Sequence, residues 1–251
     1  MEGKKGKFHL VRLIALQLLI WLNPFEYLRR TKVEKLYQSY LDDRKVAEHF
    51  RKSYLPEQFQ NNRGLVLDFG CGRGRHCAML SQCGFKVIGI DPLRYDYWHR
   101  IPNAQFIRGS SEELAFFKDE SFDLCISFQV LMYIQNDEKA VNELVRVLKR
   151  DGWVLLQVTN QNNLKTAITH RYLSNDPRII RYYTPEEVSL LLERAGLKVS
   201  KVWTEKFYSP FFTLFFGFLL EIILPHQVME LASRWTSPKY RGLINILAQK
   251  K

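Results

Sequence analysis

Short apolar segments alternate with amphipathic ones between Leu65 and Trp203. The apolar segments are rich in β-branched and aromatic residues, a pattern that predicts strands at Leu65–Phe69, Lys86–Ile90, Gln105–Ile107, Phe122–Phe128 and Trp153–Thr159. The intervening segments have helical periodicity or helical starts, which predicts helices at Arg75–Cys83, Ser111–Phe117, Glu138–Leu148 and Pro185–Ala195. This order predicts an α/β fold, a doubly wound and mostly parallel sheet with helices on both faces.

Several helix boundaries are marked by local signals. Thr184 precedes Pro185 and two glutamates, which predicts an N-cap, a proline in the first helical position and acids in the first turn. Asp151-Gly152 and Ala195-Gly196 are expected to end the helices before them.

The chain before the core has two apolar patterns. Leu13–Leu22 follows Lys4, Lys5, Lys7 and Arg12 and resembles part of a signal peptide, but no small-residue cleavage site follows it. Because a spanning helix needs about 20 apolar residues, this run favours a helix lying in a membrane interface, and the alternative is a helix packed on the protein's own core. Thr31–Tyr54 is amphipathic and charged, and Asn61–Gly64 reads as the linker into the core.

The last part of the chain contains two further segments of interest, Leu197–Trp203 and Leu243–Ala248, separated by far more residues than a hairpin loop contains. The separating segment is centred on the apolar run 211–220, with Glu221 and prolines beside it, so we do not expect a spanning helix. It is expected to cap the active site or dip into a membrane interface, and a packed helical extension or dimer surface is the alternative. The predicted parts are a basic helical segment 1–63, a core 64–206, a hydrophobic insertion 207–240 and a final strand with basic tail 241–251.

The positive charge lies on the two flanks. Residues 1–63 contain 13 Lys and Arg against 7 Asp and Glu, residues 64–160 contain 11 against 12, and residues 161–251 contain 13 against 7. A basic flank suits nucleic acid, anionic lipid or an acidic substrate. The same flanks contain the most apolar runs, which favours an anionic membrane surface as a partner.

The cysteines suggest a reducing compartment. Cys71, Cys77, Cys83 and Cys125 have spacings that fit neither a zinc knuckle nor a small secreted disulfide framework. We therefore expect a cytoplasmic protein, peripheral at the cytoplasmic membrane face if the flanks bind lipid. The histidines have no metal-ligand spacing either, so no metal is expected.

Candidate chemistry is concentrated where the first predicted strand ends. Asp68 stands two residues before the glycine-rich turn Gly70-Cys71-Gly72-Arg73-Gly74, and Asp91 ends the next strand. Glycines allow the backbone to turn sharply and to approach a ligand. The spacing differs from the GxGxxG that nucleotide-binding dehydrogenases use for a pyrophosphate, and Asp68 would repel a pyrophosphate but suits an ammonium group.

Asp68–Gly74 with Asp91-Pro92 resembles the first two motifs of class I S-adenosylmethionine-dependent methyltransferases. The resemblance extends over about 140 residues, and Gly74–His76 with Gly84–Asp91 is similar to the branch of small-molecule, quinone and lipid methyltransferases. It implies a Rossmann-like fold with a seven-stranded sheet, in which Leu197–Trp203 and Leu243–Ala248 would be the two antiparallel strands at one edge. To this fold the sequence adds N-terminal helices and a hydrophobic helical insertion before the last strand. It also implies S-adenosyl-L-methionine as the cofactor.

The resemblance implies a role for each matching residue. Asp68 and the backbone of Gly70, Cys71 and Gly72 would hold the methionine end of the cofactor, and Asp91 its ribose hydroxyls. The adenine would lie between two groups of residues, with Pro92 or Leu93 packed against the ring and Ser110, Ser111 and Glu112 at its edge. Phe128-Gln129-Val130 would lie under the sulfonium, at the end of the fourth strand.

Two departures from the family bear on catalysis. Arg73 stands where a small hydroxyl residue is usual, and Leu131–Ile134 contains Tyr133 where many relatives have histidine. Histidine is the ready general base near neutral pH, so Tyr133 is expected to orient substrate together with Gln129, and not to act as an essential base. No nucleophile motif accompanies these residues.

Taken together, these patterns predict methyl transfer from S-adenosyl-L-methionine to a hydrophobic or membrane-associated small molecule: a quinone precursor, a lipid or a lipid-linked group. An RNA methyltransferase is the alternative enzyme, and a non-catalytic cofactor-binding scaffold is the alternative outside enzymes. The RNA reading rests on charge alone, since no RNA-binding module or interleaved basic and aromatic stripe is present in the sequence.

Overall fold

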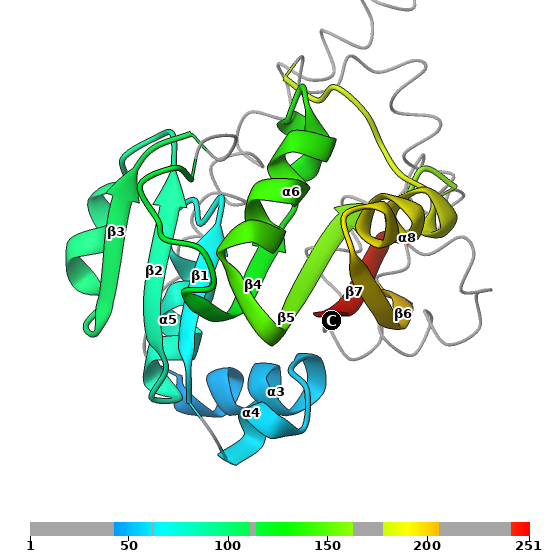
Figure 1. The fold of residues 1–251 in the computed structure, drawn as a ribbon. Helices are drawn as coiled ribbons and strands as arrows, with labels where there is room; N and C mark the ends of the chain where they lie inside the picture. Colours follow the sequence, from blue (N-terminus) through cyan, green and yellow to red (C-terminus); the bar gives the residue numbers. More distant parts are fainter. Residues whose placement is uncertain (1–42, 62, 111–113, 163–177, 206–241) are drawn as a thin grey trace, which may run out of the picture. The chain divides into compact units, whose positions relative to one another are not determined.

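The computed structural model describes residues 43–61, 63–110, 114–162, 178–205 and 242–251 (Figure 1). Its centre is one seven-stranded sheet in the order β3-β2-β1-β4-β5-β7-β6. The strands are β1 Leu65–Phe69, β2 Lys86–Asp91, β3 Ala104–Arg108, β4 Phe122–Phe128, β5 Leu148–Thr159, β6 Leu197–Glu205 and β7 Leu243–Lys250. All neighbouring pairs are parallel except those of β7, which is antiparallel to β5 and β6. The predicted Rossmann-like fold is confirmed.

Two of the described helices precede the sheet, and the others lie between its strands along the chain. They are α3 Arg44–Tyr54, α4 Gln58–Asn61, α5 Arg75–Gln82, α6 Asp137–Val147 and α8 Pro185–Arg194, with the short 3-10 helices η1 Asp96–Arg100 and η2 Leu131–Tyr133. Strand order reverses between β1 and β4, since β2 and β3 lie on one side of β1 and β4 and β5 on the other. The carboxyl ends of β1 and β4 are therefore the switch point where open α/β sheets bind ligands.

The two faces of the sheet are filled differently. Residues from α6 and α8 form one apolar cluster with buried strand residues that include Leu156, Val158, Ile244 and Ile246. Side chains alternate along a strand, so Gln157 on β5 and Asn245 on β7 point to the opposite face. That opposite face carries α5, packed on β2 and β3, and α3, packed on α5.

The predicted start of α8 is confirmed in detail. Thr184 Oγ1 accepts a hydrogen bond from the Glu187 backbone N–H, and the Glu187 carboxylate accepts one from the Thr184 N–H, which completes a capping box before Pro185. The predicted stop is confirmed as well, because Gly196 has φ +92° and its N–H donates to the Glu193 carbonyl.

Two local predictions were wrong. A helix was expected at Ser111–Phe117, but the described part of it, residues 114–117, is not helical. Side chains of α6 bind the backbone groups that such a helix would use. Glu143 accepts from the Leu114 N–H, and Arg146 donates to the carbonyls of Leu114 and Phe117. Asp151-Gly152 ends no helix either, because α6 stops at Val147 and the pair lies inside β5, where Asp151 has φ +61° beside a register shift in the β4–β5 pairing.

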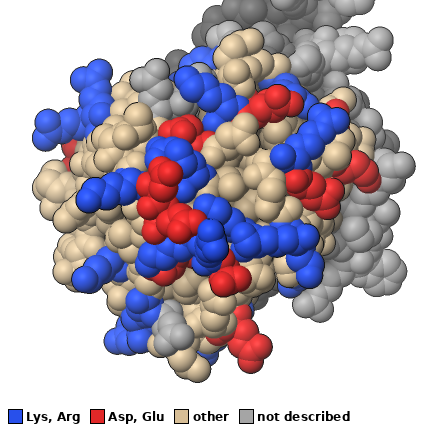
Figure 2. All heavy atoms as spheres, viewed as in Figure 1, with Lys and Arg blue, Asp and Glu red and all other residues tan. Residues whose placement is uncertain are grey.

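Charged side chains on the face drawn in Figure 2 are mixed in sign, with acidic groups among the basic ones. Among the described residues many charged side chains are paired, as in Lys149–Asp123 and Arg146–Glu143, whose N···O distances are both 2.8 Å. Within the part of the chain that the structure describes, no helix is both long enough and apolar enough to cross a bilayer. Leu13–Leu22 and 207–240, on which the membrane expectation rests, lie outside the described residues.

Candidate active site

The glycine turn after β1 has the backbone that its sequence predicts. Gly70 has φ +77°, a left-handed conformation that favours glycine, and a Cβ there would lie 2.3 Å from Val130 Cγ2. The N–H groups of Gly70 and Cys71 donate to the Ile90 carbonyl at 2.8 and 3.0 Å, which fixes the turn against the end of β2. The turn therefore places backbone atoms without a covering side chain at the switch point of the sheet.

Asp91 lies directly beside this turn, as predicted. Its carboxylate accepts hydrogen bonds from the N–H of Gly72 and the N–H of Leu93, each at 2.9 Å, and the residue is only 8% exposed. Each carboxylate oxygen has a second lone-pair site, so two ribose hydroxyls can still be accepted. The protein thus holds Asp91 in one orientation before any ligand arrives.

Asp68 is buried beneath the turn. It is 1% exposed, and the thiol of Cys77 on α5 donates to its Oδ2 at 3.1 Å. Burial raises the pKa of Asp68 to about 7, since the charged carboxylate is poorly solvated there. A bound ammonium would favour the charged form. Burial also raises the pKa of the Cys77 thiol, which makes it a poor nucleophile.

The expected adenine side is described in part. Leu93 is 52% exposed although it is apolar, and it follows Asp91 and Pro92 at the end of β2. Ser110 is exposed after β3. Ser111 and Glu112 lie outside the described residues, so their roles stay predictions.

The floor of the site is the end of β4. Gln129 has φ +61°, its backbone N–H donates to the Gln157 carbonyl at 2.8 Å, and its Oε1 accepts from the Thr159 hydroxyl at 2.6 Å. Its Nε2 is buried and has no hydrogen-bond partner among the described residues. A buried amide without a partner is costly, so this donor is suited to a ligand atom.

Tyr133 lies on η2 and is 42% exposed. The guanidinium carbon of Arg178 lies 5.8 Å from its ring centroid. The ring is therefore at the surface next to the end of β4, where it can contact a ligand, and its predicted orienting role is not tested by this geometry.

Two site residues were missed by the sequence reasoning. The imidazole of His76, on the first turn of α5, stacks on the Phe128 ring with centroids 3.9 Å apart, and its Nε2 lies 2.9 Å from an Arg75 guanidinium nitrogen. Because arginine only donates hydrogen bonds, Nε2 of His76 is the acceptor in this contact. Trp98 of η1 donates its indole N–H to the Gly72 carbonyl at 2.8 Å and stacks on Phe106.

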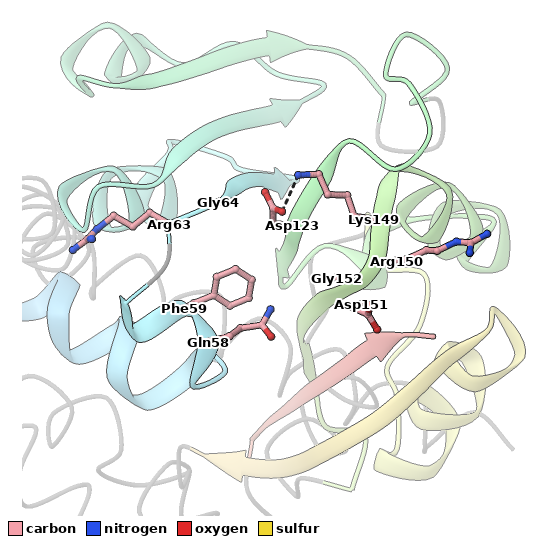
Figure 3. A pocket seen from close by; sticks show the side chains of 9 residues that line it. All are labelled: Gln58, Phe59, Arg63, Gly64, Asp123, Lys149, Arg150, Asp151 and Gly152. Atoms are coloured by element: carbon pink, nitrogen blue, oxygen red, sulfur yellow. Dashed lines mark hydrogen bonds and ion pairs between the residues drawn. The ribbon is translucent and has the colours of Figure 1, made fainter.

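A separate cavity of about 450 Å³ lies at the amino ends of β1, β4 and β5, away from the glycine turn (Figure 3). Charged groups in its wall are paired with the protein itself. Asp123 accepts from Lys149 and from the Leu65 N–H, and Arg63 donates to the Cys83 carbonyl. This cavity is on the wrong edge of the sheet for the predicted chemistry.

A family model described as a methyltransferase domain matches residues 37–202, about two thirds of the chain, and spans the whole arrangement described above. The chain belongs to the class I S-adenosylmethionine-dependent methyltransferases. Its cofactor is S-adenosyl-L-methionine, and the glycine turn, Asp91 and the buried Gln129 amide fit that molecule. The assignment of single residues to cofactor atoms stays a prediction.

This methyltransferase is similar to a probable S-adenosylmethionine-dependent methyltransferase of Mycolicibacterium smegmatis, with 29% identity over 53% of this chain and 52% of the relative. It is also similar to the mitochondrial ubiquinone biosynthesis O-methyltransferase of Bos taurus, with 27% identity over 58% of this chain and 44% of the relative. The chain thus spans about half the length of these curated relatives. A crystal structure from Thermotoga maritima, described as a possible histamine N-methyltransferase, shares the fold with a TM-score of 0.61, 20% identity, and coverage of 88% of this chain and 96% of that one.

Proposed function

We propose that this methyltransferase acts on a hydrophobic small molecule that carries an aromatic ring, with a quinone precursor as the model acceptor. Lipids and lipid-linked groups with such a ring belong to the same proposal. The methyl group comes from S-adenosyl-L-methionine, whose reactive sulfonium is already an activated leaving group.

The observation that carries the proposal is an aromatic wall, defined here as Phe50, Tyr54, Phe128 and Trp203. Phe50 and Tyr54 of α3 lie with their ring centroids 5.8 and 6.4 Å from that of Phe128, at the end of β4. Trp203 of β6 lies 5.9 Å from Tyr54. Aromatic faces bind planar rings by stacking and edge contacts, and they offer little to a charged or strongly hydrated acceptor.

The wall lies beside the residues expected to hold the reacting end of the cofactor. Phe128 directly precedes Gln129, whose buried Nε2 has no partner among the described residues. In-line positioning of an acceptor against a sulfonium can supply much of the rate enhancement. The similarity to a ubiquinone biosynthesis O-methyltransferase supports an acceptor of this chemistry.

The test is methyl transfer from S-adenosylmethionine labelled in its methyl group. Wild-type protein is incubated with para-alkylphenols, with saturated alcohols and amines of matched chain length, with total lipid extract and with total RNA. Label in the alkylphenols or in an aromatic lipid fraction supports the proposal. Label in the saturated compounds or in RNA alone would contradict it.

We further propose that the acceptor is reached at an anionic membrane surface on the cytoplasmic side. The support is the sequence alone: the excess of Lys and Arg lies on the two flanks that also hold Leu13–Leu22 and the insertion 207–240. Interfacial binding combines buried apolar area with about 1 kcal/mol per well-placed basic residue.

A further inference from the structure

A chain of hydrogen-bonded polar side chains crosses the sheet on the α3 side. Gln157 of β5 donates its Nε2–H to Asn245 Oδ1 on β7 at 2.8 Å, and Asn245 donates its Nδ2–H to Glu205 Oε1 at the end of β6 at 2.5 Å. The Tyr54 hydroxyl of α3 donates to the other carboxylate oxygen, Glu205 Oε2, at 2.6 Å. Four elements that are distant in the sequence thus converge on one carboxylate.

Two residues of this hydrogen-bonded row are buried at strand positions where apolar side chains would satisfy the packing. Asn245 is 0% exposed and Gln157 is 8% exposed. Adjacent positions on the same two strands, such as Leu156 and Ile244, face α6 and α8 and are fully apolar. Because a buried amide stabilises the fold little even when its hydrogen bonds are made, the pair indicates a role other than packing.

Strand register places this chain next to the reacting end of the site. Phe128 on β4 is paired with Gln157 on β5, Gln157 with Asn245 on β7, and Asn245 with Trp203 on β6. These four residues form one row across the sheet, and Gln129, which follows Phe128, donates its N–H to the Gln157 carbonyl. The polar chain therefore forms part of the floor beneath the aromatic wall.

The Tyr54–Glu205 contact is suited to moving a proton. An O–H···O⁻ bond of 2.6 Å lies in the range of short, charge-assisted hydrogen bonds. A hydroxyl that donates to a carboxylate has oxygen lone pairs that accept from a ligand hydroxyl. Asn245 fixes the second oxygen of Glu205, and Gln157 fixes the orientation of the Asn245 amide.

We infer that the acceptor atom is a phenolic oxygen and that its proton passes through Tyr54 to Glu205, while Asn245 and Gln157 are positioning residues for that carboxylate. The inference rests on the proposed aromatic acceptor. As the acceptor oxygen bonds to the methyl carbon, the carbon–sulfur bond breaks and its electron pair stays on sulfur. The acceptor proton moves to the Tyr54 oxygen and the Tyr54 proton moves to Glu205, which leaves a neutral carboxylic acid and a neutral thioether. This relay supplies the base that the absence of histidine from Leu131–Ile134 leaves unassigned.

The experiment compares two acceptors that differ in the acidity of the same hydroxyl. Para-hexylphenol is un-ionised at mildly alkaline pH, whereas its ortho-nitro derivative is largely ionised and has no proton to give up. For Glu205→Gln and Tyr54→Phe, we expect kcat with hexylphenol to fall on the order of 10²–10⁴-fold, the range of a general base. With the nitro derivative, both variants should stay within about threefold of wild type, because a base contributes little to an acceptor already ionised. Asn245→Leu should show the same contrast with a smaller loss.

The controls separate this role from a structural one. Calorimetric titration with S-adenosylhomocysteine and the midpoint of urea unfolding are measured for every variant, and Glu193→Gln on the exposed side of α8 is the matched change. If Glu205→Gln slows both phenols equally, the relay is wrong and the proposed function stands. If wild type methylates neither phenol, the proposed function fails and the relay fails with it.

Discussion

The hydrogen bond from Trp98 to the Gly72 carbonyl should determine how tightly the glycine turn holds the cofactor. Trp98→Phe removes the indole N–H, which donates a 2.8 Å hydrogen bond from η1 to this turn, and keeps an aromatic ring next to Phe106. The Trp98–Phe106 stack has centroids 4.9 Å apart and planes at 11°, so a phenyl ring can keep most of it. The perturbation is therefore close to the deletion of a single hydrogen bond.

The magnitude follows from the nature of that bond. A neutral intramolecular hydrogen bond contributes about 0.5–1.5 kcal/mol, and Gly72 is half-buried, so water can replace the lost donor. We expect Trp98→Phe to raise the Kd for S-adenosylhomocysteine about 2-fold to about 12-fold. Trp98→Leu also removes the stack and should weaken binding further.

The assay is isothermal titration with S-adenosylhomocysteine, with Trp153→Phe as the matched control. The Trp153 indole N–H is buried and makes no hydrogen bond among the described residues, so its removal should leave the Kd unchanged. Equal Kd values for wild type and Trp98→Phe, with Trp98→Leu also unchanged, would refute the reasoning and show that cofactor binding by the turn does not depend on Trp98.

The remaining predictions concern the cofactor acids, the tyrosine and the flanks. Asp91→Ala should weaken S-adenosylhomocysteine binding by roughly 1.5–3 kcal/mol, measured by titration, because hydrogen bonds to a charged group are lost. With its pKa raised to about 7, the Asp68 carboxyl is protonated below that pH. Cofactor affinity should therefore fall by up to about tenfold per pH unit as the pH decreases from 7. In titrations of Asp68→Asn this pH dependence should be absent. Tyr133→Phe should keep kcat within about tenfold of wild type, and a loss on the order of 10²–10⁴-fold with an unchanged Kd would make it the general base instead. Deletion of 207–240 should reduce flotation with anionic liposomes at low salt, and a wild-type protein that does not float would contradict the membrane proposal.

The glycine turn after Asp68 could be predicted because its geometry is local. A strand that ends in Asp68 and Phe69, followed by glycines at alternate positions, leaves few backbone paths, and Gly70 takes the left-handed conformation that its residue type allows. The start of α8 is equally local, since Thr184 and Glu187 bond each other across one helical turn. Such signals need no knowledge of the rest of the fold.

The errors and omissions come from long-range contacts. The expected helix through residues 114–117 was lost to Arg146 and Glu143, which bind its backbone from another helix. Trp98 reaches Gly72 across 26 positions of sequence, and its aromatic pattern in isolation gave no sign of that partner. A helical propensity is weak evidence when a buried side chain elsewhere offers better hydrogen-bond partners.

The most informative omission is on β5 and β7, where a strand that reads as uniformly apolar has two different faces. The apolar majority of Trp153–Thr159 predicts a strand, and the single glutamine in it, Gln157, does not change that prediction. Burial on both faces explains the apolar majority, but period-two alternation puts Gln157 and Asn245 together on the side of α3 while their neighbours fill the core. Because packing favours apolar residues at both positions, we attribute the two amides to their contacts: Asn245 donates to the Glu205 carboxylate, and Gln157 donates to Asn245. In a protein of this fold, an isolated polar residue near the carboxyl end of a central strand is therefore a candidate site residue, as the glycines and acids are.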